Sequence, residues 1–116
     1  ESLGSLFKAG ESKKHGMLQL LTYCEAYLSL VDPDVEIEPH IHPMRELSKG
    51  NPIADLRVSS ENITGYKAQL RDNFRPLLHH YLHRIFGPDG SFGQTHDQKV
   101  CDFCNFASLC GRIKSN

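Results

Sequence analysis

The stretch Met17-Leu-Gln-Leu-Leu-Thr-Tyr-Cys-Glu-Ala-Tyr-Leu-Ser-Leu-Val31 gives the strongest indication of the fold. Its apolar residues recur at steps of three and four, which is the spacing of one buried face of an α-helix. The sequence Asp32-Pro33-Asp34 follows, and proline disrupts a helix interior. The sequence therefore predicts an amphipathic helix over residues 16–31. Its buried face would consist of Met17, Leu20, Leu21, Cys24, Leu28 and Val31.

The segments around this helix have patterns of their own. Residues 1–15 are rich in Gly, Ser and Lys, so we expect a loop. Apolar and polar residues alternate on both sides of a turn at Lys49–Pro52, which predicts a β hairpin over residues 35–58. Residues 61–86 have helical spacing with Pro76 inside, which predicts a long helix that is kinked or divided. The remaining pattern is a cysteine-bearing tail over residues 100–112.

Composition limits the class of protein. The chain has 116 residues and a formal net charge of −1, and this length suits one domain. The predicted helices and hairpin together indicate the α+β class, mostly helical with a small two-stranded β unit. The balanced charge gives no overall signature of nucleic-acid binding. No apolar run approaches the roughly 18 residues of a membrane span, and no signal peptide is visible. We therefore expect a cytoplasmic protein with reduced cysteines and no membrane contact.

Three of the four cysteines lie close together, in the order Cys101-x2-Cys104-x5-Cys110. Such spacing lets thiolates converge on one metal, and both tetrahedral zinc and a four-iron cluster normally take four ligands. The chain offers two candidates for a fourth ligand, Cys24 on the predicted helix and His96 just before the cluster. The alternative interpretation is three cysteines that pack with neighbouring apolar side chains and bind no metal.

Two further motifs accompany the cysteines. Gln19 and Tyr23 are four residues apart and therefore share a face of the predicted helix. The stretch His42-Pro-Met-Arg-Glu-Leu47 follows this helix. With the cysteine tail, which ends Cys110-Gly111, this order resembles the C-terminal part of RecB-type nucleases of the PD-(D/E)XK superfamily, and the resemblance implies a strand over residues 42–47. The resemblance covers nearly the whole chain.

The resemblance implies a fold, an activity and cofactors. The chain would be the C-terminal half of a restriction-endonuclease-like fold, in a nuclease that acts in DNA repair or recombination and can work with a helicase subunit or domain. Cys101, Cys104 and Cys110 would hold a 4Fe-4S cluster with a cysteine from further upstream. Gln19 and Tyr23 would be accessory residues of an active site that binds Mg²⁺. We would also expect a half-domain to self-associate.

The family's main catalytic acids should precede the helix with Gln19, and too few residues precede it here. Glu11-Ser-Lys13 and Asp97-Gln-Lys99 have the letters of the catalytic E/D-x-K motif, but both fall in expected loops. We therefore expect this chain alone to be inactive on DNA. Two rival classes remain open, which are a stand-alone zinc-binding interaction module and a metal-free helical scaffold.

Other polar groups are weaker candidates. Lys13 and Lys14 lie before the glutamine helix, where the resemblance would place DNA phosphates, although a short basic run is usually a solvated loop. His79 and His83 are four apart on the predicted long helix, a spacing that can bind zinc. Because no carboxylate or cysteine motif accompanies them, we expect them to face solvent.

Overall fold

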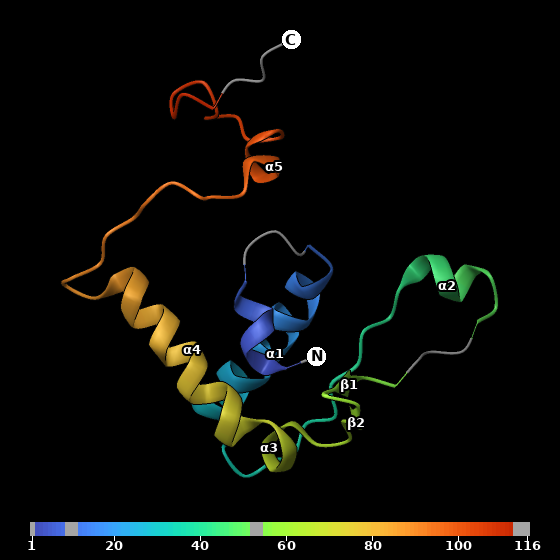
Figure 1. Ribbon diagram of the computed structural model, residues 1–116. Helices are drawn as coiled ribbons and strands as arrows, with labels where there is room; N and C mark the ends of the chain where they lie inside the picture. Colours follow the sequence, from blue (N-terminus) through green and yellow to red (C-terminus); the bar gives the residue numbers. More distant parts are fainter. Residues whose placement is uncertain (1, 9–11, 52–54, 113–116) are drawn as a thin grey trace.

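The structure of the chain is a computed structural model, and it describes residues 2–8, 12–51 and 55–112, apart from the side chains of residues 12 and 13. Its elements are mostly helical, with one two-stranded antiparallel sheet, so the expected α+β class is confirmed at this level (Figure 1). Among the described residues, no helix is long and apolar enough to cross a membrane.

The predicted first helix is confirmed, and it begins earlier than expected. A 3-10 helix, η1, covers Leu3–Phe7, and helix α1 covers Ser12–Leu30, so the expected loop over residues 1–15 is wrong. Leu21, Cys24 and Leu28 are buried as the spacing predicted, whereas Val31 lies beyond the helix and is exposed. The Gly and Ser content of residues 1–15 concealed Leu6, which is buried against α1 and holds η1 in place.

The β hairpin is real but lies further along the chain than predicted. Strands β1 (Arg57–Val58) and β2 (Glu61–Asn62) pair antiparallel, with Val58 opposite Glu61. The turn between them consists of Ser59 and Ser60, whose φ angles are 52° and 69°. The expected hairpin over residues 35–58 is therefore wrong in its bounds.

Residues 35–43 are extended without pairing as a strand. Pro39 and Pro43 have no backbone N–H to offer to a neighbouring strand. The backbone of the segment instead bonds to a helix, with the Tyr66 N–H donating to Ile37 O at 2.7 Å. The stretch expected to be a strand at 42–47 contains helix α2, Met44–Ser48. The Lys49 and Gly50 N–H groups bond back to carbonyls of this helix.

The predicted long helix is two helices. Helix α3 covers Tyr66–Gln69 and helix α4 covers Arg71–Phe86, with Leu70 between them in a non-helical conformation. We expected the kink or division at Pro76, but the proline lies inside α4. The division between the two helices occurs at Leu70. Tyr66, Leu70 and Phe74 are buried, whereas the apolar side chains near the end of α4 are exposed.

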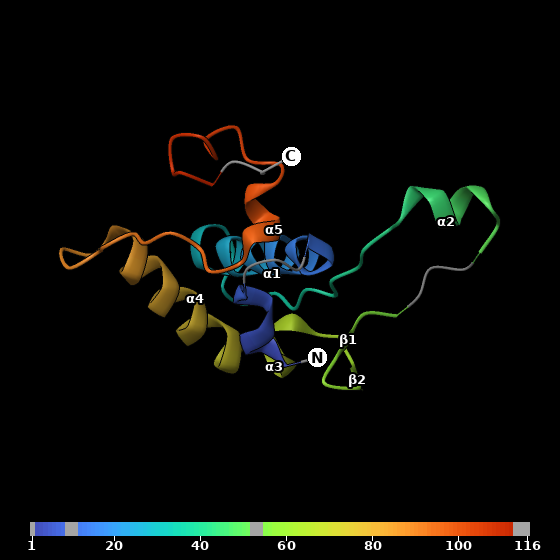
Figure 2. The same ribbon diagram turned by 45° about the horizontal axis from the view of Figure 1, so that its top comes forward.

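The core lies where η1, α1, the hairpin and the start of α4 meet. Phe7 of η1 stacks on Tyr81 of α4 with ring centroids 4.4 Å apart. An extended segment leads from α4 to the short helix α5 (Gln98–Cys101) and the cysteine tail, which stand apart from the core in Figure 1, as does α2 on the other side. In Figure 2 the tail again lies outside the helical core, above α1 in the view. The buried residues of the core are Leu6, Leu21, Cys24, Leu28, Leu56, Val58, Ile63, Tyr66, Leu70 and Phe74.

Candidate functional site

The three clustered cysteines line one pocket. Cys101, Cys104 and Cys110 all contribute to a cavity of about 400 Å³, so the structure brings together the three residues that the spacing grouped. Cys101 is half-buried and the other two are exposed. The other lining residues all come from the same part of the chain and are Phe92, Gly93, Gln94, Thr95, Val100 and Arg112.

Local hydrogen bonds form the cysteine tail. The Asp97 carboxylate caps α5 by accepting from the Lys99 N–H at 3.0 Å. The Asp97-Gln-Lys99 motif therefore has a structural role, as the start of this short helix. A turn follows, in which the Cys104 N–H donates to Cys101 O at 3.2 Å. The Phe106 N–H then points at the Cys104 sulfur, with N and Sγ 3.4 Å apart. Backbone hydrogen bonds to sulfur are among the features that tune iron–sulfur sites.

Neither candidate for the fourth ligand lies on this pocket. Cys24 is 4% exposed and packs in the core among Leu21 and Leu28, where burial raises the pKa of its thiol. His96 is exposed and does not line the cysteine pocket. Within the part of the chain that the structure describes, no group of three or more His, Cys, Asp or Glu side chains has the geometry to hold a metal ion. A fourth ligand for this pocket therefore has no source among the described residues.

The donor set of the pocket can be compared with the metals that the sequence suggested. Three thiols beside Phe92 and Val100 offer sulfur and apolar walls, with no carboxylate. Sulfur donors suit zinc and iron–sulfur clusters, whereas Mg²⁺ takes oxygen ligands. The donor types are thus those that a soft metal or a cluster takes and not those that Mg²⁺ takes, whereas the geometry of the described residues does not bring three such donors onto one ion.

Gln19 and Tyr23 interact directly. The Gln19 Nε2 group donates to the Tyr23 hydroxyl at 2.9 Å, which confirms that the two side chains share a face of α1. Gln19 is exposed and Tyr23 is 62% exposed. Because another face of α1 contains the buried Leu21 and Leu28, the pair points outward from a helix that packs into the core.

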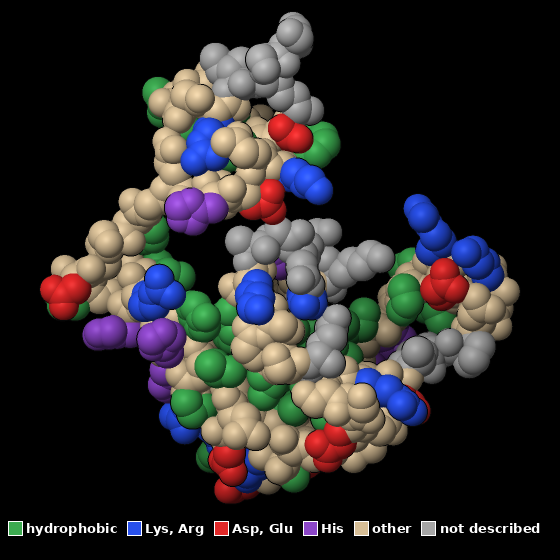
Figure 3. Space-filling model, viewed as in Figure 1, with side chains coloured by type: hydrophobic (Ala, Val, Ile, Leu, Met, Phe, Trp, Pro, Cys, Tyr) green, Lys and Arg blue, Asp and Glu red, His purple; other side chains and the backbone are tan. Residues whose placement is uncertain are grey.

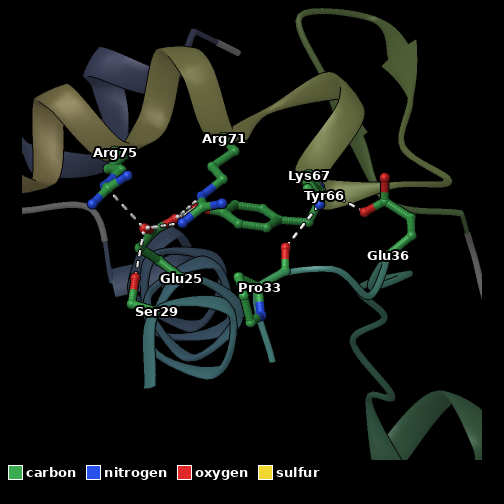
Figure 4. Close-up of polar contacts among 8 residues, drawn as sticks. All are labelled: Glu25, Ser29, Pro33, Glu36, Tyr66, Lys67, Arg71 and Arg75. Carbon is green, nitrogen blue, oxygen red and sulfur yellow. Dashed lines mark hydrogen bonds and ion pairs between the residues drawn. The ribbon is translucent and has the colours of Figure 1, made fainter. Parts of the chain in front are cut away.

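The sequence analysis missed a buried carboxylate on α1. Glu25 is 4% exposed and accepts hydrogen bonds from the Tyr66 hydroxyl at 2.8 Å and from Ser29 Oγ at 3.0 Å (Figure 4). Arg71 Nε lies 3.2 Å from Glu25 Oε2, and Arg75 Nε lies 3.2 Å from Glu25 Oε1. We call these five residues the Glu25 network. It joins α1 to α3 and α4.

The network changes the acidity of its members. Burial alone would raise the pKa of Glu25, but hydrogen bonds from Tyr66, Arg71 and Ser29, together with the Arg71 charge, outweigh it and lower that pKa. Burial, followed by the bond to Glu25 and its charge, raises the pKa of Tyr66 far above its usual value. One signal in the sequence could have found Glu25, since it lies four residues after Leu21 on the apolar face of the helix.

A second carboxylate fixes the start of α3. Glu36 accepts from the Lys67 N–H at 2.7 Å, and Lys67 Nζ donates to Pro33 O at 2.7 Å (Figure 4). Glu36 also accepts from the Ala68 N–H at 3.0 Å. Burial raises the pKa of Glu36, but backbone N–H bonds from Ile37, Lys67 and Ala68 and the Lys67 charge lower it overall. The carboxylate thus satisfies helix donors and anchors the extended segment.

The weaker candidates are scattered. Lys13 lies in the first turn of α1, and its side chain is outside the described part of the structure, whereas Lys14 is half-buried. His79 and His83 on α4 are exposed as expected, and histidine side chains lie along this helix in Figure 3. His40 pairs with Glu38, with Nε2 and Oε1 3.2 Å apart.

Comparison of the chain with protein-family models, with curated proteins and with solved structures finds no match.

Proposed function

We propose that the chain is the C-terminal portion of a metal-dependent DNA nuclease domain of the PD-(D/E)XK superfamily, of the RecB type, acting in repair or recombination. The observation that carries the proposal is the outward-facing Gln19–Tyr23 hydrogen bond on α1. It stands in one chain with a cysteine-lined pocket, in the order that the family resemblance requires. In the complete domain these elements would belong to a restriction-endonuclease-like fold.

Gln19 and Tyr23 have the chemistry for an accessory function. With one Gln19 N–H committed to Tyr23, the pair keeps a second amide N–H and the phenolic O–H as donors. Donors of this kind contact phosphate oxygens of DNA. We therefore assign them to positioning the nucleic acid or supporting the active site, while carboxylates outside this chain would hold Mg²⁺.

The cysteines have the chemistry for a structural cofactor. Cys101, Cys104 and Cys110 would supply three thiolates to a 4Fe-4S cluster, and a residue outside the described part would supply the fourth ligand. Such a group would link the tail to the rest of the domain and take no part in cleavage. Partners in this proposal are DNA and a helicase subunit or domain.

The test compares two lengths of the protein. The 116-residue chain should not digest labelled duplex DNA with Mg²⁺, whereas a chain extended upstream through a strand with a D/E-x-K motif should digest it. In the extended chain, Tyr23→Phe should lower kcat/KM about tenfold, because one hydrogen bond to a charged group is lost. Tyr27→Phe, one helical turn further on, is the matched control and should retain full activity.

Two results would overturn the nuclease proposal. One is Mg²⁺-dependent digestion by the 116-residue chain itself, which would place the catalytic acids among its own residues. The other is the absence of a D/E-x-K strand upstream, or an extended chain that contains such a strand and leaves DNA intact.

A zinc-binding interaction module is the second candidate. It is favoured by the fact that every residue lining the cysteine pocket lies between 92 and 112, so the pocket does not depend on the helical core. Metal analysis of the extended protein, purified without oxygen, separates the two. Iron with visible absorbance supports the cluster, whereas colourless protein with stoichiometric zinc supports the module.

A further inference from the structure

Cys101 and Cys104 are the two ends of one turn. The Cys104 N–H donates to Cys101 O at 3.2 Å, and Asp102 between them has φ −60° and ψ −30°. These are features of a type I turn, whose first and last Cα atoms lie less than about 7 Å apart. Cysteines joined by a disulfide have Cα atoms about 4.4–6.8 Å apart. The turn therefore brings the two residues within the reach of a disulfide bond.

The two residues also share their surroundings. Both thiols are free, and both residues line the cavity of about 400 Å³ and a second one of about 310 Å³. Cys104 is exposed and Cys101 is half-buried, so a dissolved reagent reaches Cys104 first. A disulfide needs only two thiols, whereas the described residues offer no group of three donors for a metal ion.

Cys110 belongs to a different turn. Its N–H donates to Phe106 O at 3.1 Å, and its carbonyl accepts from Gln94 Nε2 at 2.9 Å. These bonds tie Cys110 to Phe106 and Gln94, whereas the bond between Cys101 and Cys104 ties those two residues to each other. The turn thus pairs Cys101 with Cys104 and leaves Cys110 as the odd thiol of the tail.

We propose that Cys101 and Cys104 are a reversible modification site, at which a low-molecular-weight disulfide converts their two thiols to an intramolecular disulfide. The thiolate of Cys104 attacks one sulfur of the reagent, which forms a mixed disulfide and releases one small thiol. The thiolate of Cys101 then attacks Cys104 Sγ and releases the second small thiol. The protein loses two protons and two electrons, and the reagent takes them up as its two halves become thiols.

The Phe106 N–H supports exchange in both directions. It points at Cys104 Sγ, with N and Sγ 3.4 Å apart. Negative charge is present on this sulfur when Cys104 attacks the reagent, and it develops there again when a small thiol attacks Cys101 and reopens the disulfide. A fixed donor stabilises charge that develops beside it, so the link should open as readily as it closes. The inference does not rest on the proposed function, because it needs no metal.

The experiment uses the whole 116-residue chain, reduced, stripped of metal with a chelator and then exposed to oxidised glutathione under nitrogen. Trypsin cuts after Lys99, and chymotrypsin cuts after Phe103, which lies between the two cysteines. The expected product is residues 100–103 linked to residues 104–106, detected by mass spectrometry and lost on treatment with dithiothreitol. Cys24 is buried in the core and should stay unlinked, so it is the internal control.

Two variants separate the steps. Cys101→Ser removes the thiol of the second step, so the glutathione adduct on Cys104 should accumulate at least about tenfold above the wild-type level, because no intramolecular reaction consumes it. Cys110→Ser is the matched control. It keeps both members of the pair and should form the same link at the same ratio of oxidised to reduced glutathione.

The contribution of the turn is measured against the unfolded chain. In concentrated urea the three tail cysteines lose their fixed geometry. The folded chain should therefore favour the Cys101–Cys104 link over the other two pairings of the tail about tenfold more than the unfolded chain does. Equal preferences in the two states would show that the turn contributes nothing and would overturn the inference.

Three other results would also contradict it. One is a link from Cys110 to either cysteine as the main product of the folded chain. The second is a tail that carries only glutathione adducts, because the intramolecular step would then not occur. The third is a chain that keeps all its thiols at excess oxidised glutathione. The expected link in both the wild-type chain and Cys110→Ser supports the inference, whether or not the chain is part of a nuclease.

Discussion

Glu25 shows how one buried charge can join two helices. A carboxylate taken out of water is costly unless it is paired and fully hydrogen-bonded. Here Tyr66, Ser29 and two arginines supply donors to both oxygens. Arg75 is half exposed, so its contribution is screened by solvent, and Tyr66 and Arg71 are the principal partners.

We expect Glu25→Gln to destabilise the protein by about 3 kcal/mol, because it leaves the Arg71 charge partly buried without a partner. Glu38→Gln is the matched control. Glu38 is exposed beside His40, and its loss should change the free energy of unfolding by less than about 0.5 kcal/mol. Urea denaturation at neutral pH measures both. Equal effects of the two substitutions would show that the network adds nothing to stability.

The lowered pKa of Glu25 predicts that the stability of the fold depends on pH. The folded-state pKa of Glu25 is lowered relative to an unfolded value of about 4.3. Its stabilising effect is therefore complete above the unfolded pKa and is lost as pH falls through the folded pKa. In Glu25→Gln, the free energy of unfolding measured by urea denaturation should therefore decrease less as the pH is lowered below about 4.3.

At the residue scale, sequence reasoning located interactions that follow from regular spacing. Gln19 and Tyr23 bond because a helix places residues four apart side by side. The Glu25 network depends on residues more than 40 positions apart, which no periodicity reveals. Nothing in the spacing of Arg71 and Arg75 along their helix indicates that both pair with Glu25.

Among the elements, the hairpin shows how a short sheet can form with unfavourable turn residues. Ser59 and Ser60 both have positive φ, as a two-residue hairpin turn of the primed type requires. Glycine and asparagine adopt such angles readily, whereas serine pays a steric cost of about 1 kcal/mol.

Ser60→Gly should therefore stabilise the protein by about 0.5 kcal/mol, the relief of strain exceeding the added entropy of the unfolded chain. Ser91→Gly is the control. Ser91 lies in an exposed loop and is not among the described residues with positive φ, so it should give no gain. Thermal denaturation of both variants tests this. A lower midpoint for Ser60→Gly would mean that the serine side chain contributes more than its backbone strain costs.

Element boundaries were the least predictable part of the fold. Alternation in residues 35–43 correctly indicated an extended chain, and Val35 and Ile37 do pack on the core. The alternation of apolar and polar residues could not reveal that this segment would bond to a helix and not to a strand. The start of α3 was hidden because Glu36, thirty residues upstream, supplies its capping oxygens.

The whole molecule is less compact than a globular chain of its length. Its radius of gyration is 17.5 Å, whereas a compact domain of this size would have about 13 Å. Helix α1 buries one face and leaves Tyr23, Tyr27 and Leu30 exposed on the other. Figure 3 shows hydrophobic side chains at the surface where α1 and α4 meet.

Such a surface leads us to expect self-association. Leu30 is 84% exposed, so Leu30→Glu should shift the chain toward monomer in sedimentation at high concentration. Met44→Glu on α2, at a residue 78% exposed, is the control and should leave the distribution unchanged. A wild-type chain that sediments only as monomer would contradict the expectation.

At this scale the sequence predicted the class and the grouping of three cysteines. It could not predict that Cys24 belongs to the core and not to the cysteine pocket, because a cysteine packed in a core and a cysteine that lines a pocket can occupy the same helical position.

The burial of Cys24 has a practical consequence. Its thiol is 4% exposed at the centre of the helical core, whereas Cys104 and Cys110 are open to solvent. An alkylating reagent must therefore wait for the core to open before it can modify Cys24, although the tail thiols are accessible from the start. The rate of that slow labelling step therefore reports how often the core around α1 opens. It needs no added probe and works in a chain that contains no tryptophan.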